Sequence, residues 1–261
     1  MDQNQTKKQI IDHYESLLYR PDVFEYYGQS HFLNFGYWLE DTPDQKIACE
    51  NLMEKLLSFI PEKSGTILDV ACGNGATTAY LLKYYQPENV MGINISHGQL
   101  EMARTIAPGC TFLLMDATQL EFQDNAIDNI ICVEAAFHFD TREKFLKEAH
   151  RVLKPGGFLV LSDILVTLES ERIRDMRTKD NYLKDLEEYE DLLLQVGFRE
   201  TKVLNATKPC WMAHFLYLVK YVHQKFFSRE IGFEDMQRYL NRTYRRVPDL
   251  EFYLISAARK I

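Results

Sequence analysis

The sequence lacks the patterns typical of secreted, membrane-spanning or metal-binding proteins. Its five cysteines are scattered and form no CxxC pair, which argues against a zinc site and a disulfide framework. No uncharged apolar run reaches the roughly 18 residues needed to cross a bilayer. The first residues also lack the apolar stretch of a secretory signal. We therefore expect a cytoplasmic protein with no metal site and no membrane insertion.

Positive charge is also scarce. The chain has 30 Lys and Arg against 38 Asp and Glu, a net charge of −8, so no cationic groove for nucleic acid is expected. The one dense basic segment, residues 242–246, is short and is interpreted as a solvated helix face. A hydrophobic fraction of 46% supports a proper core in a chain of 261 residues. The expected partner is a small molecule, with a homodimer left open.

Short apolar segments alternate with helical ones, which predicts βαβ units and a parallel sheet. Most of the strand segments are apolar throughout, as in strands covered on both faces. We therefore predict an α/β fold: a Rossmann-like, doubly wound, mostly parallel seven-stranded sheet. The expected strands are residues 66–71, 89–95, 111–117, 127–135, 158–166, 200–207 and 251–259.

The expected organisation is a single domain in three parts. Residues 1–60 are an aromatic-rich helical segment that caps the cofactor and substrate. Residues 61–166 are the cofactor-binding core, in which a KPGG turn separates the fifth strand from the helix before it. Residues 167–261 complete the sheet and contain a helical insert, about 207–246, expected to lie over the sheet as a substrate lid.

A glycine turn follows the first predicted strand, in the segment LDVACGNGATTAYLL at residues 68–82. Gly73, Asn74 and Gly75 resemble a dinucleotide-binding turn, but Thr78 stands at its third glycine. Asp69 would repel a pyrophosphate and attract an ammonium group. S-adenosylmethionine has an amino group and a nucleoside but no phosphate. The alternative is that Asp69 only caps the following helix.

Other strand ends supply the remaining candidates for cofactor binding. Asn94 and Gln99 are placed to meet the ribose hydroxyls. Asp116 can accept a hydrogen bond from the adenine amino group. Glu134 ends the fourth strand and either faces the sulfonium or caps that strand. The predicted cofactor residues on the sheet side are Asp69, Ala71, Gly73, Asn74, Gly75, Asn94, Ile95, Gln99, Asp116, Ala117 and Glu134.

These motifs resemble the class I S-adenosylmethionine-dependent methyltransferases. The resemblance rests on ILDVACGNGATT, VMGINIS, LLMDAT, FHF and RVLKPGGFLVLSD in this order, and is strongest to enzymes that methylate sugars and natural products. It implies S-adenosylmethionine as cofactor and S-adenosylhomocysteine as product. Tyr37 and Trp38, in a GYW motif, are expected to close over the cofactor with Tyr14. Asn94 departs from the family, which often has Asp there.

The resemblance also implies a catalytic pair. His138 follows the fourth strand and suits removal of a proton near neutral pH, and Asp163 ends the fifth strand and would orient it. The alternative is that His138 only packs. His150 is expected to be structural, while any of the four other histidines singled out could touch substrate: His13, His31, His214 and His223.

The leading hypothesis is methyl transfer to a hydroxyl or amine of a small, largely apolar or aromatic molecule. One alternative is C-methylation of a lipid-like or aromatic substrate, with Glu134 stabilising the intermediate. Another is a catalytically silent protein that binds the cofactor. A dehydrogenase is disfavoured by Asp69 and Thr78. The acceptor cannot be read from the insert.

Overall fold

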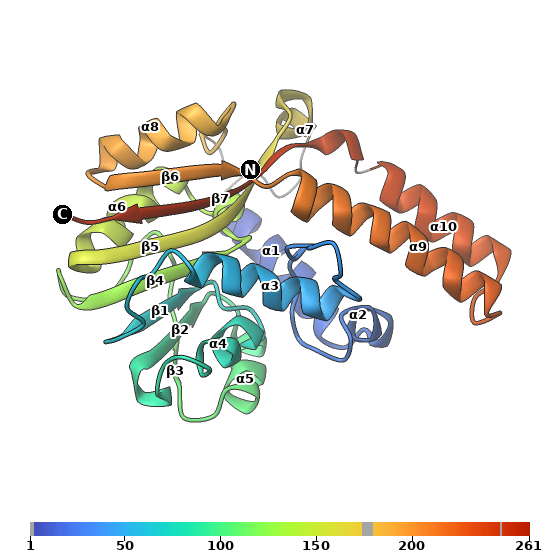
Figure 1. Ribbon diagram of the computed structural model, residues 1–261, viewed down its shortest axis with the longest axis horizontal. Coiled ribbons are helices and arrows are strands. Elements are labelled where there is room, and N and C mark those ends of the chain that lie inside the picture. Colours follow the sequence, from blue (N-terminus) through green and yellow to red (C-terminus); the bar gives the residue numbers. More distant parts are fainter. Residues whose placement is uncertain (1–2, 174–179, 246) are drawn as a thin grey trace.

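One seven-stranded sheet forms the centre of the molecule. The computed structural model describes residues 3–173, 180–245 and 247–261. Its strand order is β3-β2-β1-β4-β5-β7-β6, and β7 pairs antiparallel with both β5 and β6, whereas the other strand pairs are parallel (Figure 1). The predicted doubly wound, mostly parallel sheet is confirmed. The strands are β1 Ile67–Val70, β2 Val90–Asn94, β3 Thr111–Leu114, β4 Ile127–Val133, β5 Leu153–Val166, β6 Arg199–Asn205 and β7 Leu250–Arg259.

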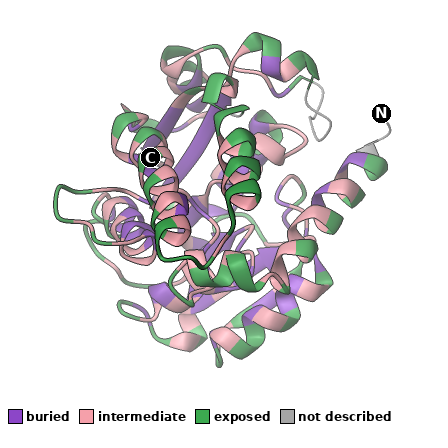
Figure 2. Cartoon of the chain, turned by 90° about the vertical axis from the view of Figure 1, so that its right-hand side faces the viewer, coloured by how far each residue is buried: buried purple, intermediate pink, exposed green. Residues whose placement is uncertain are grey.

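Helices cover both faces of this sheet, which explains why its strands are apolar throughout. Because side chains alternate along a strand, Leu68 and Ile130 enter one core, and their neighbours Ile67 and Ile131 enter the other. The first core is closed by α6 (Arg142–Val152) and α8 (Leu186–Val196), and the second by α3 (Gln45–Leu57) and α4 (Ala76–Leu81). The purple strands of Figure 2 show this burial.

Helix boundaries largely follow local sequence signals. Ser96 accepts a hydrogen bond from the Gln99 backbone and begins α5 (His97–Ile106), as predicted. Gly197, at φ 120°, ends α8. Two boundaries differ from expectation. Residues 154–157 are no separate turn but the irregular start of β5, since Leu153 already pairs with Ile127. β3 ends at Leu114, so Asp116 lies in the following loop.

The N-terminal segment and the insert meet beyond the carboxyl ends of the strands. The former contains α1 (Gln3–Leu18) and α2 (Pro21–Tyr26), and the latter α9 (Ala213–Phe227) and α10 (Phe233–Arg245) after a π-helical turn, Lys208–Met212. In Figure 1, α9 and α10 project as a pair beyond the strand ends and do not lie over a face of the sheet as expected, whereas their role as a substrate lid stays a prediction. Their aromatic residues pack on α2 instead: Tyr26 lies 5.1 Å from the ring of Tyr221.

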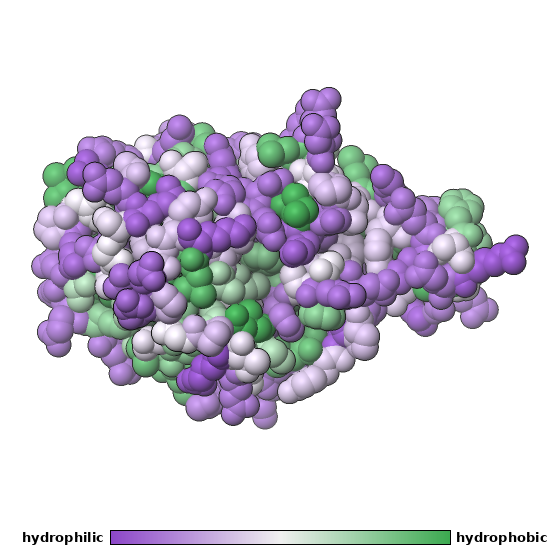
Figure 3. Space-filling model, turned by 60° about the horizontal axis from the view of Figure 1, so that its bottom comes forward, coloured by the Kyte–Doolittle hydropathy of each residue, from purple (hydrophilic) through white to green (hydrophobic). Residues whose placement is uncertain are grey.

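The surface of this projecting pair mixes polar and apolar side chains (Figure 3). Arg242 and Arg245 are exposed, in agreement with the predicted solvated helix face, and residue 246 lies outside the described residues. Shorter helical segments complete the fold: α7 Leu168–Ile173, η1 Pro87–Asn89, η2 Ala136–His138 and η4 Val247–Asp249. Among the described residues, no helix combines the length and apolar character needed to cross a membrane.

Candidate functional site

A cavity of about 960 Å³ opens at the carboxyl ends of the central strands. Its floor comes from the ends of β1, β2, β4 and β5, and its walls from α1, α2, α9 and α10. The volume is at the upper end of the range for small-molecule sites, roughly 300–1,000 Å³, which leaves room for a cofactor and an acceptor. The predicted cofactor and catalytic residues that line it are Tyr14, Ala71, Gly73, Asn74, Asn94, Ile95, Gln99, Asp116, Ala117, Glu134 and His138. Of the histidines expected to touch substrate, His13, His31 and His214 line it and His223 does not.

Tyr37 and Trp38 lie outside the cavity wall, contrary to the expectation that they close over a cofactor. The Trp38 ring packs 4.5 Å from that of Tyr217, and its indole N–H donates to the Phe35 carbonyl. Its backbone N–H donates to the Pro209 carbonyl at 2.8 Å. These contacts attach the N-terminal segment to the start of the insert, so the motif holds two walls of the cavity together.

Asp69 also lies behind the cavity wall. Its carboxylate accepts hydrogen bonds from the hydroxyls of Thr77 at 2.7 Å and Thr78 at 2.6 Å. Burial raises the pKa of Asp69 to about 6, although both threonines oppose the shift. Thr77 lines the cavity and Asp69 does not, so Thr77 stands between this carboxylate and the cavity. Thr78, at the position of the absent third glycine, thus serves as a hydrogen-bond donor to this carboxylate.

The two glycines of the turn have different surroundings. A Cβ on Gly73 would meet its nearest neighbour at 3.8 Å, so its face toward the cavity is open. A Cβ on Gly75 would come within 2.7 Å of the Ala103 Cα. Gly75 therefore lets α4 start against α5. The structure assigns it to helix packing, and it does not line the cavity.

Three side-chain amides form a network beside the turn. Asn94 donates to the Gly73 carbonyl at 3.4 Å and to Gln99 Oε1 at 3.0 Å, and accepts from the backbone N–H groups of Ile95 and Ser96. Its hydrogen-bonding capacity is thus used within the protein. Gln99 donates one bond, to Asn74 at 3.1 Å. It keeps one donor and one acceptor site, so Gln99 rather than Asn94 suits ribose hydroxyls.

Asp116 is held at the cavity by a partner that the sequence did not reveal. Lys7 of α1 forms an ion pair with one oxygen, and Thr118 donates its N–H and its hydroxyl, each at 2.7 Å, to the other. Burial alone would raise the pKa of Asp116, but Lys7 and Thr118 lower it overall. Three of about four acceptor positions are occupied. The fourth fits a single donor such as an adenine amino group.

His138 pairs with Tyr14 and not with Asp163. The Tyr14 hydroxyl lies 3.0 Å from His138 Nε2, and both residues line the cavity. Tyr14 comes from α1 and His138 from η2, just after β4. Their sequence separation hides the contact from local patterns, and this explains why the expected partner was the nearer strand end.

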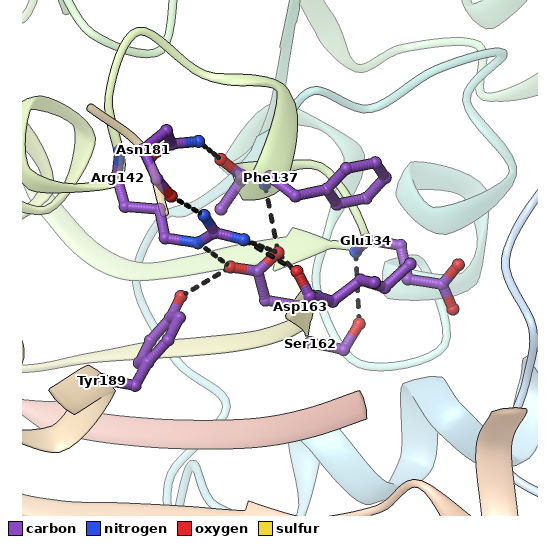
Figure 4. Close-up of polar contacts among 9 residues, drawn as sticks. Glu134, Phe137, Arg142, Ser162, Asp163, Asn181 and Tyr189 are labelled. Atoms are coloured by element: carbon purple, nitrogen blue, oxygen red, sulfur yellow. Dashed lines mark hydrogen bonds and ion pairs between the residues drawn. The ribbon is translucent and has the colours of Figure 1, made fainter. Parts of the chain in front are cut away.

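Asp163 is fully buried among other partners (Figure 4). It forms an ion pair with Arg142 at 2.7 Å and accepts from the Tyr189 hydroxyl at 3.1 Å and the Phe137 N–H at 3.1 Å. The predicted base–orienter pair is therefore wrong. A carboxylate with these donors anchors the η2 turn that carries His138, because it binds the backbone of the preceding residue. A buried arginine at a helix start has no signature in the sequence.

Glu134 points away from Asp163 and into the cavity (Figure 4). Its backbone has a φ of 50°, and its N–H donates to the Ser162 carbonyl. One carboxyl oxygen accepts from the Phe35 N–H at 2.7 Å and the Tyr253 hydroxyl at 2.6 Å. Burial raises the pKa of Glu134 to about 8. The group is thus largely protonated, and neutral, at pH 7.

The outer wall is largely apolar, and two of its cations are paired with carboxylates, whereas Arg242 of the same wall has no ion pair among the described residues. Arg20 is paired with Asp22, and Lys225 with Glu25 at 2.6 Å. The sequence does not mark these residues as part of a site, because their patterns match solvated helix faces. Apolar side chains fill the space between them: Leu17, Val23, Trp211, Phe215, Leu218 and Val222. In the described part of the chain, no group of three or more His, Cys, Asp or Glu is arranged to hold a metal ion.

Comparisons with known proteins indicate the family of this chain. Residues 68–161 match a family model described as a methyltransferase domain. The 27-O-demethylrifamycin SV methyltransferase of Amycolatopsis mediterranei is 29% identical, over 69% of this chain and 72% of that protein. The O-methyltransferase rstn1 of Aspergillus nomiae is 31% identical, over 60% of this chain and 70% of that protein. Two other curated relatives are matched over 58% and 53% of their lengths.

The fold has close counterparts among solved structures. The cyclopropane synthase MmaA2 of Mycobacterium tuberculosis superimposes with a TM-score of 0.73, covering 97% of this chain and 98% of that one. The two sequences are 19% identical, so the likeness concerns the fold alone.

Proposed function

Because this chain belongs to the class I S-adenosylmethionine-dependent methyltransferases, we propose that it methylates a hydroxyl group of a small, largely apolar or aromatic molecule. When bound, S-adenosylmethionine supplies a methyl group attached to a positively charged sulfur. The observation that carries the proposal is the Tyr14–His138 hydrogen bond at the cavity wall. The names of the two relatives described above, which include an O-methyltransferase and an enzyme for a 27-O-demethyl compound, also support oxygen as the acceptor.

Tyr14 and His138 offer a route for the proton that an acceptor hydroxyl must lose. With the Tyr14 hydroxyl on Nε2, the acceptor proton passes to the Tyr14 oxygen while the Tyr14 proton passes to His138. Neutral imidazole suits this task near pH 7. The Asp163–Phe137 contact keeps the histidine turn in place. Gly73, Gln99 and Asp116 are the residues that we assign to holding the cofactor.

The walls support an apolar acceptor over an anionic one. Lys7, Arg20 and Lys225, three cations at the cavity, already have carboxylate partners. An anionic substrate would have to displace one of those carboxylates or bind Arg242, an exposed cation of the wall that forms no ion pair among the described residues. An apolar or aromatic body gains burial against the aromatic walls. An amine acceptor remains the second form of the proposal, since it needs less help in losing a proton.

C-methylation assisted by Glu134 is the weaker alternative. A carboxyl that is largely neutral at pH 7 offers little negative charge to a cationic intermediate. The silent-protein alternative predicts cofactor binding without any methylated product.

The test is turnover with and without the pair. Extracts incubated with deuterated-methyl cofactor identify the acceptor by mass. His138→Ala is then expected to lower kcat roughly 10²–10⁴-fold for a hydroxyl acceptor, and Tyr14→Phe is expected to lower it in the same direction. The matched control is His223→Ala, since His223 lies outside the cavity wall. Unchanged turnover of His138→Ala with a hydroxyl acceptor would contradict the assignment.

A further inference from the structure

Another histidine of the cavity, His214 on α9, is buried and held in place by a hydrogen bond and by ring stacking. It is 7% exposed and lines the cavity. Its Nδ1 lies 2.8 Å from Gln45 Oε1. Phe35 stacks against its ring at a centroid distance of 4.7 Å. The Trp211 ring lies 6.3 Å from the His214 ring, at an interplanar angle of 24°. The imidazole is therefore held in both position and plane.

The orientation of Gln45 determines which nitrogen of His214 has the proton. Gln45 Nε2 donates to the carbonyl oxygens of Asn34 at 2.9 Å and Phe35 at 3.1 Å. Carbonyls only accept, so the amide nitrogen must face them and Oε1 must face His214. An oxygen acceptor requires a proton on Nδ1. The Nε2 of His214 is consequently the unprotonated nitrogen, with a lone pair.

That lone pair faces the cavity. His214 Nε2 has no hydrogen-bond partner among the residues that the structure describes. Protein atoms do not fully bury it, so part of its surface is exposed. Since His214 is 7% exposed and lines the cavity, we infer that the exposed nitrogen opens to that space. Burial also lowers the pKa of His214 to about 3, so the ring stays neutral at physiological pH and is too weak a base to remove a proton from a hydroxyl.

We propose that His214 Nε2 is a fixed hydrogen-bond acceptor for a second donor group, a hydroxyl or N–H, on the methyl acceptor. The molecule recognised then has two polar groups: one that is methylated next to Tyr14 and His138, and one that binds α9 of the insert. This inference rests on the proposed function because it describes the same substrate. It gives the insert a role in selecting substrate in addition to enclosing it.

The first test is direct. In protein labelled with ¹⁵N-histidine and saturated with S-adenosylhomocysteine, we expect His214 to keep the Nδ1–H tautomer from pH 5.5 to 8. Adding phenol at millimolar concentration should move its Nε2 resonance, and adding toluene should not. The signal is identified by its loss in His214→Phe. The matched variant His223→Phe changes a histidine on the same helix that lies outside the cavity and donates to the Val219 carbonyl.

His214→Phe should fold, because a phenyl ring keeps the stacking on Phe35 and Gln45 Oε1 still accepts from the Tyr26 hydroxyl. With the acceptor identified by deuterated methyl transfer, this variant is expected to raise the acceptor KM roughly 5- to 100-fold. Its kcat and its KM for S-adenosylmethionine should stay within about twofold of wild type, as should all constants of His223→Phe.

The outcomes separate this inference from the proposed function. A His214 that titrates near its ordinary pKa, has the other tautomer, ignores phenol, or responds equally to toluene would overturn the inference. So would an acceptor KM that His214→Phe leaves unchanged. None of these results affects the role of His138. Conversely, full turnover by His138→Ala with a hydroxyl acceptor would refute the proposed function, and the tautomer and phenol response of His214 would stand.

Discussion

Carboxylates at neighbouring strand ends of this protein differ in their surroundings more than in their chemistry. Asp69 binds two threonine hydroxyls, Glu134 a backbone N–H and a tyrosine, and Asp163 an arginine. Of the three, only Glu134 lines the cavity. A carboxylate at the end of a strand is therefore a candidate for function, and its partners decide between a ligand contact and an anchor for the backbone.

The amide network leads to a prediction at the residue scale. Gln99→Leu removes the remaining donor and acceptor that we assign to ribose hydroxyls, and keeps a side chain of similar size. We expect the Kd of S-adenosylhomocysteine to rise about 3- to 10-fold, equivalent to one net hydrogen bond. Titration calorimetry measures the change.

The control for Gln99 is Thr105→Val, an exposed position on the same helix whose hydroxyl donates only to the Glu101 carbonyl. An unchanged Kd in Gln99→Leu would contradict the assignment of Gln99 to the ribose hydroxyls. A Kd raised equally in Thr105→Val would show that the change in Gln99→Leu is not specific to that residue.

At the scale of elements, the glycine turn sets the distance between two helices. Gly75→Ala forces a Cβ to within 2.7 Å of the Ala103 Cα at a φ of 87°. Gly73→Ala adopts a φ of 54° with no neighbour nearer than 3.8 Å. Both should lose about 1–2 kcal/mol of unfolding free energy from the left-handed backbone. Gly75→Ala should lose roughly 1–3 kcal/mol more from overpacking.

Urea unfolding of the two alanine variants measures this difference. Equal losses would mean that α4 and α5 separate freely, and the assignment of Gly75 to helix packing would fail. Because Gly73 lines the cavity and Gly75 does not, the cofactor Kd of the folded variants should respond in the opposite order, with Gly73→Ala affected more.

For the whole molecule, buried titratable groups predict how stability depends on pH. The pKa of Glu134 is raised from its ordinary 4.5 to about 8, so between these values the folded protein binds a proton that the unfolded chain has lost. Its contribution is full below pH 4.5 and is lost as pH rises through about 8, with a slope of at most about 1.4 kcal/mol per pH unit. Burial lowers the pKa of His214 to about 3, so this residue reduces the stability of the folded protein only as the pH falls below 6.5.

Glu134→Gln tests that dependence, because an amide oxygen can still accept from Phe35 and Tyr253 and does not titrate. We expect the Tm of the wild type to fall relative to that of Glu134→Gln between pH 6.5 and 9. Differential scanning fluorimetry across this range gives the comparison. Parallel curves for the two proteins would show that Glu134 is ionised at neutral pH, and would restore weight to the C-methylation alternative.

The sequence by itself determined the order of strands and helices, the glycine turn, the end of the sheet at which the cavity opens, and the family. These features depend on local periodicity, on helix caps such as Ser96, and on the rule that ligands of open parallel sheets bind at the carboxyl ends of the strands. Residues close together in the chain are enough to apply all three. Gly73 and Asp116 could be placed at the cavity for the same reason.

Only the tertiary structure decided that His138 meets Tyr14, that Arg142 and Tyr189 hold Asp163, that the insert projects away from the sheet, and that His214 lines the cavity beside Gln45. Each depends on contacts between segments far apart in the chain, where packing and the need to satisfy buried polar groups choose the partner. No local pattern encodes that choice.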